Sequence, residues 1–354
     1  MLLKKLQLTN FRNYSSLDIE FDSRPTILVG GNGAGKSNLL EAIYLLSTTK
    51  SLRVEIENEL IKENQEFAKI EGFVANSSET ELLIIINKPT DEVKFKKRLI
   101  VNGISRRTVD FIGHLPAIIF YPQDINMVTG SPSLRRWHID LSLAQIDPAY
   151  KRSLTLYEQF LTARNRVLKS IKEGKSKTPE LDFWTRGLVD NGKIITDKRQ
   201  AFFDFIEQQP KVLGDFRFVY HPSALSSEKL QETNGREVAA AATLIGPHRD
   251  DFVLITFEKN LAHFGSRGEQ RMGTLAFKLA QLEYMAHILG KRPVLLLDDI
   301  FSELDENHRN LIGEIALKQQ TIISTIEMSE IPSNLLDKAR ILQVEDGKIT
   351  QSGN

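Results

Sequence analysis

The feature that most constrains this chain is a glycine-rich loop that follows an apolar run and precedes a helical pattern. The loop reads GGNGAGKSN and fits the spacing G-x-x-x-x-G-K-[ST], with Gly30, Gly35, Lys36 and Ser37 at its fixed positions. Glycines let the backbone curl so that successive N–H groups face a phosphate, while the lysine supplies a cation and the serine hydroxyl can bind Mg²⁺. The pattern predicts a nucleotide-binding strand–loop–helix unit. The alternative is a glycine-rich turn that binds nothing.

A second segment, VLLLDD at 294–299, supports the nucleotide interpretation. A continuous apolar run is expected of a parallel strand that is buried on both faces, and its carboxyl end is where α/β sheets place ligands. Asp298 would hold Mg²⁺ directly or through water, and Asp299 could orient or deprotonate an attacking water. Alternatively, Asp299 only caps the following turn. The expected catalytic residues are therefore Lys36, Asp298 and Asp299, and Mg²⁺ would lie between Ser37 and Asp298.

The remaining residues of the loop complete the expected nucleotide site. Its backbone and side chains would contact ATP along the whole segment, which comprises Gly30, Gly31, Asn32, Gly33, Ala34, Gly35, Lys36, Ser37 and Asn38.

Strand patterns lie near both ends of the chain, and helical patterns lie between them. We expect an α/β unit with mixed sheets built from residues 1–130 and 210–354, and an inserted, mainly helical lobe at 131–209. Ser131-Pro132 and Asp147-Pro148 are typical of helix starts, with the proline in the first turn. The segments at 67–76, 80–87 and 97–103 predict an antiparallel meander.

Composition limits the possible functions. Lys plus Arg and Asp plus Glu both number 46, so any basic binding surface must be local. The chain has no cysteine, which excludes disulfides, zinc–thiolate sites and cysteine catalysis. We read no signal peptide at the N-terminus and no apolar run of membrane-spanning length, so a cytoplasmic protein without membrane partners is expected.

A short segment before a long helical pattern, GSRGEQ at 265–270, permits two interpretations. Ser266 and Glu269 fit a capping box, in which each side chain bonds to the other residue's backbone. A helix start with bare N–H groups also suits an anion, and glycines on both sides of Ser266 would allow a close approach.

Taken together, the motifs resemble those of the RecF family of ABC-type, SMC-like ATPase heads. The resemblance covers nearly the whole chain and is carried by LTNFRNY, the phosphate loop, GSPSLRR, GPHRDD, GSRGEQ and LDDIFSELD, in that order. It implies an ABC-type ATPase head that sandwiches two ATP molecules between two subunits. In such a homodimer, Ser266 and Gly268 of one subunit would face the γ-phosphate held at Lys36 of the other. SELD at 302–305 would line the same interface.

The resemblance carries further residues onto the nucleotide. Arg12 and Asn13 match a family segment near the nucleotide, although an exposed turn after the first strand is the alternative. Gln123 lies where a Q-loop residue would bind Mg²⁺ or water, but a strand-ending Pro-Gln-Asp turn explains it equally well. The switch histidine of ABC heads is missing, with Thr325 the nearest candidate. Asp299 replaces their usual glutamate, which suggests slow hydrolysis.

The same resemblance supplies the expected biological role. It implies a weak, DNA-stimulated ATPase that assists RecA loading at single-strand gaps beside duplex, with RecO and RecR as partners. Arg135 and Arg136 are the expected DNA contacts, or they pair internally with carboxylates such as Asp140. Two other interpretations are an SMC-like chromosome-organising head, for which the insertion is too short to form a long coiled coil, and a transporter ATPase subunit.

Overall fold

The chain folds into two compact units. The computed structural model describes residues 2–54, 56–75, 78–88 and 96–351. One unit combines the N-terminal segment up to Asp124 with the C-terminal segment from Gln281, and the other comprises Ile125–Ala280. Both chain ends therefore contribute to one unit, as the sequence pattern predicts. The second unit, however, extends well beyond the expected boundary at residue 209.

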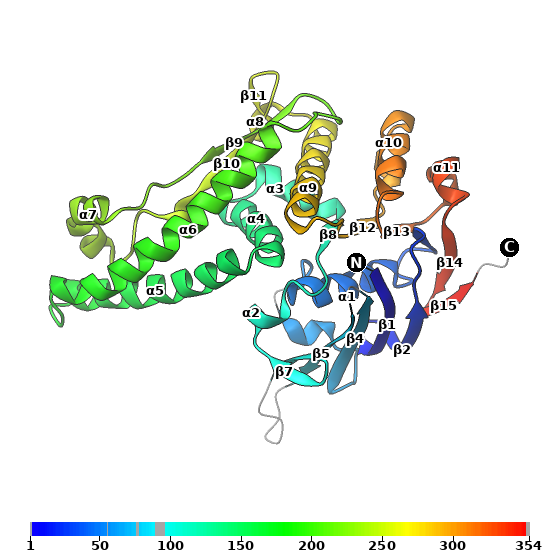
Figure 1. The fold of residues 1–354 in the computed structure, drawn as a ribbon, viewed down its shortest axis with the longest axis horizontal. Coiled ribbons are helices and arrows are strands. Elements are labelled where there is room, and N and C mark those ends of the chain that lie inside the picture. Colours follow the sequence, from blue (N-terminus) through cyan, green and yellow to red (C-terminus); the bar gives the residue numbers. More distant parts are fainter. Residues whose placement is uncertain (1, 55, 76–77, 89–95, 352–354) are drawn as a thin grey trace. The chain divides into compact units, whose positions relative to one another are not determined.

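The first unit contains a six-stranded sheet that carries the phosphate loop (Figure 1). Its strand order is β15-β14-β3-β13-β12-β8, and all neighbours are parallel except β14 and β15. The central strands are short apolar runs buried on both faces, which matches the pattern expected of parallel strands. The strands are β3 (Thr26–Val29), β8 (Ala117–Phe120), β12 (Val294–Asp298), β13 (Thr321–Thr325), β14 (Arg340–Glu345) and β15 (Lys348–Gln351).

An antiparallel sheet forms the second layer of this unit, in the order β2-β1-β4-β5-β6-β7. Its strands are β1 (Leu2–Phe11), β2 (Tyr14–Glu20), β4 (Phe67–Ala75), β5 (Glu79–Asn87), β6 (Lys97–Val101) and β7 (Ile104–Arg106). Strands β4 to β7 pair in chain order, so the predicted meander is confirmed.

Helix α1 (Lys36–Thr48) contacts strands of both sheets and is almost completely buried. Gly72 of β4 allows this close packing, because a Cβ there would lie 2.5 Å from the Leu46 side chain. The phosphate loop at the start of α1 is therefore anchored in the core of the unit. Three further helices belong to this unit: α2 (Thr108–Phe111), α10 (Glu306–Ala316) and α11 (Ser333–Leu336).

The second unit is built around two long helices that form an antiparallel hairpin, α5 (Pro148–Lys172) and α6 (Asp182–Glu207) (Figure 1). Asp147 caps α5 by accepting the N–H groups of Ala149 and Tyr150, and Pro148 occupies the first turn, as the sequence predicts. The other helices are α3 (Asn126–Thr129), α4 (Pro132–Ile146), α7 (Ser227–Ala240), α8 (Leu261–Phe264) and the first part of α9 (Arg267–Leu289).

A three-stranded sheet explains why this unit continues beyond residue 209. Strands β9 (Phe216–His221), β10 (Asp251–Thr256) and β11 (Lys259–Asn260) pair in the order β11-β10-β9. Phe203 of α6 stacks on Tyr220 of β9 with ring centroids 4.8 Å apart, and Phe202 meets Phe277 of α9 edge-on at 5.8 Å. These aromatic contacts bind the sheet and α9 to the helical hairpin, so the insertion is not purely helical.

The turn between β10 and β11 has an unusual backbone. Only Phe257 and Glu258 separate the paired residues Thr256 and Lys259, and their φ angles are 45° and 60°. Two-residue hairpin turns of this kind favour Asn and Gly, because side chains crowd the left-handed region. Phe257 is therefore held in a conformation that its side chain disfavours. Apart from this local feature, the predicted mixed α/β fold with an insertion is confirmed.

Candidate nucleotide-binding site

The phosphate loop connects the end of β3 to the start of α1. Gly33 and Gly35 have left-handed φ angles of 79° and 117°, which side-chain-bearing residues rarely adopt. A Cβ on Gly30 would lie 2.2 Å from the carbonyl oxygen of Val344 in β14, so a side chain cannot fit there. The glycines are thus required by the curl of the loop and by its packing against the neighbouring strand.

A cavity of about 200 Å³ opens beside this loop. Its lining comprises Asn32, Gly33, Ala34, Gly35, Lys36, Ser37 and Asn38 of the loop together with Arg53, Asp298, Asp299, Ser324 and Ile326. The parallel order of β12, β13 and β3 produces this convergence, because the carboxyl ends of these strands meet at one edge of the sheet. The structure therefore brings the loop and both aspartates to a single site.

Lys36 and Ser37 are held by short hydrogen bonds. The Lys36 ammonium donates to the carbonyl oxygens of Gly30 at 2.6 Å and Gly31 at 2.9 Å. Burial lowers its pKa, and the nearby charges of Asp299 and Asp298 oppose that shift. The Ser37 hydroxyl donates to Oδ1 of Asp298 at 2.8 Å. A hydroxyl oxygen at the start of α1 and a carboxylate oxygen at the end of β12 therefore lie next to each other at the cavity.

This oxygen pair fits a magnesium ion. Mg²⁺ prefers oxygen ligands and commonly takes only one or two from the protein, with phosphate and water completing the shell. Burial raises the pKa of Asp298, whereas hydrogen bonds from Ser324 and Ser37 lower it. Within the described residues no cluster of three or more His, Cys, Asp or Glu side chains could hold a metal alone.

Asp299 differs from its neighbour in backbone and environment. Its φ is 51°, and its N–H donates to the main-chain oxygen of Ser324 at 3.1 Å and to the Ser324 hydroxyl at 3.0 Å. Its Oδ1 is buried without a hydrogen-bond partner among the described residues. Burial raises the pKa of Asp299, and the charges of Glu330 and Asp298 add to the shift.

The next turn does not use the Asp299 side chain as a cap in the described structure. The Ser302 hydroxyl donates to the main-chain carbonyl oxygen of Asp299 instead, at 2.9 Å. An unpartnered carboxylate oxygen at the cavity favours the catalytic interpretation over the capping alternative.

Arg12 and Asn13 take different positions around the loop. The Asn13 amide donates to the carbonyl oxygen of Ala34 at 3.0 Å and accepts a bond from the Asn38 amide at 2.9 Å. Arg12 instead pairs bidentately with the buried Glu41 of α1, at 2.9 and 3.0 Å. Both side chains are thus engaged by the loop or its helix, and direct contact with a nucleotide stays a prediction for each.

Gln123 and Thr325 do not line the cavity. Gln123 is exposed in the turn after β8, where Asp124 accepts the N–H of Tyr121 at 2.9 Å and stabilises the turn. Thr325 is buried and donates to Glu330 at 2.9 Å. The turn alternative accounts for the Pro-Gln-Asp sequence, so metal binding by Gln123 stays a prediction without geometric support.

Three lining residues, Arg53, Ser324 and Ile326, were missed by sequence reasoning. Ser324 donates to Oδ1 of Asp298 at 2.5 Å from the neighbouring strand, and pairing of β13 beside β12 could have indicated it. Arg53 lies in the segment after α1, donates to the Asn38 amide oxygen at 2.9 Å and presents a cation to the cavity. No sequence signal marks Arg53, because its segment has no regular periodicity.

The predicted capping box at the start of α9 is confirmed. The Glu269 carboxylate accepts the Ser266 N–H at 2.7 Å, and the Ser266 hydroxyl accepts the Glu269 N–H at 3.3 Å. Gly265 is required by internal packing, because a Cβ there would lie 2.7 Å from the Leu261 carbonyl oxygen. A Cβ on Gly268 would meet no atom of the described residues within 4 Å. Packing against the described part of the chain therefore does not account for Gly268, which leaves room for an approach from outside.

Arg135 and Arg136 make contacts within the second unit. Arg135 pairs bidentately with Asp251 at 2.6 and 2.9 Å and donates to the Gly130 carbonyl oxygen at 2.7 Å. Arg136 donates to the main-chain oxygen of Asp250 at 2.6 Å. The geometry favours the structural alternative, with Asp251 in place of Asp140 as the partner, and DNA contact by either arginine stays a prediction.

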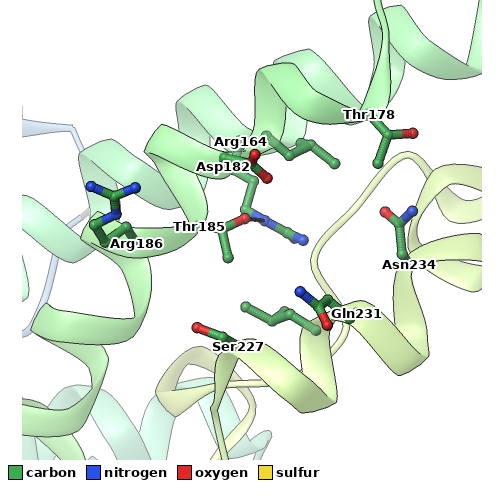
Figure 2. A pocket seen from close by; sticks show the side chains of 10 residues that line it. Arg164, Thr178, Asp182, Thr185, Arg186, Ser227, Gln231 and Asn234 are labelled. Carbon is green, nitrogen blue, oxygen red and sulfur yellow. Dashed lines mark hydrogen bonds between the residues drawn. The ribbon is translucent and has the colours of Figure 1, made fainter.

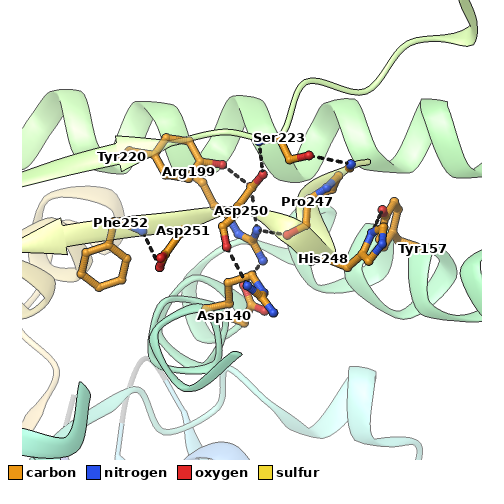
Figure 3. A network of polar contacts seen from close by, with 12 residues as sticks. Asp140, Tyr157, Arg199, Tyr220, Ser223, Pro247, His248, Asp250, Asp251 and Phe252 are labelled. Carbon is orange, nitrogen blue, oxygen red and sulfur yellow. Dashed lines mark hydrogen bonds and ion pairs between the residues drawn. The ribbon is translucent and has the colours of Figure 1, made fainter. Parts of the chain in front are cut away.

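The GSPSLRRWHID and GPHRDD segments meet in a buried polar network centred on Arg199 (Figure 3). Its guanidinium donates to Asp140 at 2.7 Å and to both Asp250 and the Pro247 carbonyl oxygen at 2.8 Å. Asp250 also accepts bonds from the Ser223 N–H and the Tyr220 hydroxyl. The two motifs thus hold α4, α6, β9 and the start of β10 together.

A separate cavity of about 320 Å³ lies in the second unit between α6 and α7 (Figure 2). Arg164 of α5 reaches it but pairs with the buried Glu237 at 2.7 Å, so its charge is compensated within the fold. The remaining lining comprises Thr178, Leu181, Asp182, Thr185, Arg186, Ser227, Leu230, Gln231 and Asn234. This cavity shares no residue with the phosphate-loop site.

Comparisons with known proteins find a family model and relatives that match nearly the whole chain. The family model described as "RecF/RecN/SMC N terminal domain" matches residues 2–350. The chain is 34% identical over 377 residues to the "DNA replication and repair protein RecF" of Halalkalibacterium halodurans, with each chain fully covered. The protein of that name from Oceanobacillus iheyensis is also 34% identical, over 99% of this chain and 100% of the relative.

Two solved structures also match the chain over almost its whole length. A structure described as the recombination mediator protein RecF with ATP in the RecFOR pathway matches with a TM-score of 0.88 and 28% identity, over 99% of this chain and 97% of that one. An Smc head domain from Pyrococcus furiosus matches with a TM-score of 0.55 at 18% identity, over 99% and 96% of the two chains, which shows a shared fold alone. No helix in the described part of the chain is long and apolar enough to span a membrane.

Proposed function

This chain belongs to the RecF family of DNA replication and repair proteins, and we propose that it acts in recombinational repair as a switch that binds ATP, dimerises and engages DNA. The single observation that carries the proposal is the convergence of Lys36, Ser37, Asp298 and Asp299 on one cavity. A site of this composition suits a nucleoside triphosphate and its hydrolysis.

ATP and Mg²⁺ are the proposed ligands of this cavity. The loop from Gly30 to Asn38 would surround the phosphates, with Lys36 turning from the carbonyl oxygens that it now contacts toward the outer phosphates. Ser37 and Asp298 would hold Mg²⁺, which supplies charge neutralisation on the phosphates when it is bound. Arg12 and Asn13 would support the loop beside the nucleotide.

Hydrolysis would depend on Asp299. Its unpartnered Oδ1 is available to accept a proton from a water that attacks the γ-phosphorus, while the bond to the ADP oxygen breaks. An aspartate reaches less far than a glutamate, so we propose slow turnover. A slow ATPase of this kind times the release of a complex rather than driving motion. Stimulation of turnover by DNA is part of the same proposal.

Completion of the site would require a second copy of the chain. Ser266 and Gly268 are exposed at the start of α9, and the open space around Gly268 supports a close approach by another molecule. We propose that these residues contact the γ-phosphate held at Lys36 of the partner copy. ATP would thus join the two copies and hydrolysis would release them.

The biological setting follows from family membership and is proposed in the same way. The chain would act at single-strand gaps beside duplex DNA, with RecR and RecO as partners, and would assist RecA loading. Arg135 and Arg136 are retained as candidate DNA contacts only if their removal changes DNA binding in a folded protein. The SMC-like alternative is less favoured, because the Smc head shares only 18% identity with this chain.

A mixture of two defective chains tests the trans arrangement. Ser266→Arg should keep ATP binding but lose ATP-dependent association, and Lys36→Ala should lose both. Mixed together, they can form one intact composite site, from Lys36 of the first chain and Ser266 of the second. Light scattering should therefore show partial recovery of association with ATP. A Ser266→Arg protein that dimerises normally would refute the trans role and leave the capping box as the whole function of this loop.

A further inference from the structure

Phe264 stands next to the proposed trans contact. It is the last residue of α8, lies two positions before Ser266, and is 71% exposed. Gly265 between them packs against Leu261 so closely that a side chain would clash with the Leu261 carbonyl oxygen. Phe264 and Ser266 therefore lie on one short, tightly packed segment, and a molecule that reaches Ser266 must also approach Phe264.

Packing within the described structure makes little use of this side chain. Its recorded ring contact is with the neighbouring His263, edge-on with centroids 6.4 Å apart. A single exposed aromatic residue needs no explanation by itself. An exposed aromatic residue indicates an interface when an exposed apolar surface lies at the group that it would meet. In the proposed composite site, that group is the phosphate-loop cavity of the partner copy.

Such a surface follows β13 in the first unit. Ile326 lines the phosphate-loop cavity beside Lys36 and Asp299 and is 38% exposed. Met328, two residues later, is 44% exposed. Ile326 thus borders the cavity on the subunit that holds the nucleotide, and a second exposed apolar side chain, Met328, follows it in the same segment.

We propose that Phe264 packs against Ile326 and Met328 of a second copy of this chain when ATP joins the two subunits. This inference rests on the proposed trans arrangement, since Ser266 would bring Phe264 to the partner's cavity. By two-fold symmetry each dimer contains this apolar contact twice, once beside each nucleotide. The occupant of the surface is therefore another copy of the chain rather than an unrelated protein.

The contact gives the dimer a component that does not depend on phosphate charge. Removing apolar area from water stabilises association, and the same contact excludes water from one side of the γ-phosphate. Exclusion of water strengthens the charge interactions of Lys36 within the site. Phe264 would accordingly set how strongly the two copies associate once ATP is bound, without affecting how one copy binds ATP.

Phe264→Ala provides the direct test, with Phe183→Ala as its matched control. Phe183 lies on α6 of the same unit and is 67% exposed, so its truncation removes a similar amount of exposed aromatic surface. Analytical ultracentrifugation with ATP should show dimerisation weakened at least tenfold by Phe264→Ala, equivalent to about 1.4 kcal/mol. The dimerisation constant of Phe183→Ala should stay within about twofold of the wild-type value. Calorimetry should find the same ATP affinity for the monomers of the wild type and of both variants.

The possible results separate this inference from the proposed function. If the wild type dimerises with ATP and Phe264→Ala does so equally well, the apolar contact is refuted while the trans role of Ser266 survives. If the wild type does not associate with ATP, the proposed function fails and the contact fails with it. Equal losses in Phe264→Ala and Phe183→Ala would indicate a general surface effect and also overturn the inference.

A double substitution tests the identity of the partner surface. Met328→Ala should weaken dimerisation in the same direction as Phe264→Ala, because it removes the other side of the contact. Since the two residues would touch across the interface, the combined variant should lose less than the product of the two single effects. A fully multiplicative loss would mean that the two residues act independently, which would refute this pairing.

Discussion

Replacing Arg135 by alanine decides between the structural role of this residue and its role in DNA binding. The substitution removes a bidentate ion pair with Asp251, with N–O distances of 2.6 and 2.9 Å, and a bond of 2.7 Å to the Gly130 carbonyl oxygen. The two side chains are 11% and 29% exposed, so Asp251 can partly rehydrate. The loss should therefore lie between those of an exposed pair and a fully buried pair, at about 2–3 kcal/mol of unfolding free energy.

Urea unfolding followed by tryptophan fluorescence measures this loss in the relevant part of the chain. Both tryptophans, Trp137 and Trp184, lie in the second unit with the ion pair. Asp251→Ala should cost a similar amount, and the double variant should cost much less than the sum, because the two residues share one interaction.

DNA binding supplies the refuting measurement. If Arg135 is structural, folded Arg135→Ala protein should keep the salt dependence of DNA binding, because no phosphate contact is lost. Unchanged stability together with weaker binding and a shallower salt slope would refute the structural interpretation. That result would support the interpretation of Arg135 as a DNA contact.

Three further predictions concern the phosphate loop and the strained turn. Lys36→Ala should abolish ATP binding in a calorimetric titration, because the cation within 3 Å of the Gly30 and Gly31 carbonyl oxygens is removed from the loop; unchanged affinity would exclude the loop as the nucleotide site. Asp299→Asn should keep ATP binding but slow phosphate release at least a hundredfold, since an amide cannot accept the water proton; turnover at the wild-type rate would mean that another group activates the water. Phe257→Asn should raise the unfolding free energy by about 0.5–1 kcal/mol, because asparagine tolerates the φ of 45° at this turn; a lower stability in urea would show that the exposed ring makes a stabilising contact.

The phosphate loop and the sheet around it could be predicted from sequence because their signals are local. Glycine spacing, a short apolar run before the loop and helical periodicity after it all lie within about twenty residues. The meeting of Ser37 and Asp298 could also be anticipated, because parallel strands end at one edge of a sheet. These inferences use the geometry of single elements and a general rule for their assembly.

The boundary of the second unit could not be obtained in this way. It is set by contacts between distant segments, such as Phe203 on Tyr220 and Phe202 on Phe277, and no local pattern specifies which aromatic residues will meet. The carboxylate that pairs with Arg135 could likewise not be predicted from the sequence. Asp140 was the nearest carboxylate in sequence, but Arg199 takes it in the fold, and Asp251 from a remote strand pairs with Arg135.

The shared guanidinium of Arg199 also restricts how such a sequence can change during descent. Asp140, Arg199 and Asp250 come from three separate segments and meet in one buried network. Losing Arg199 would leave the carboxylates of Asp140 and Asp250 without their shared cation, at a cost of about 3–5 kcal/mol, whereas replacing a whole buried set by apolar residues can be nearly neutral. Loss of Arg199 is therefore blocked unless an earlier change has added spare stability. Related chains that keep both carboxylates should consequently keep Arg199 as well.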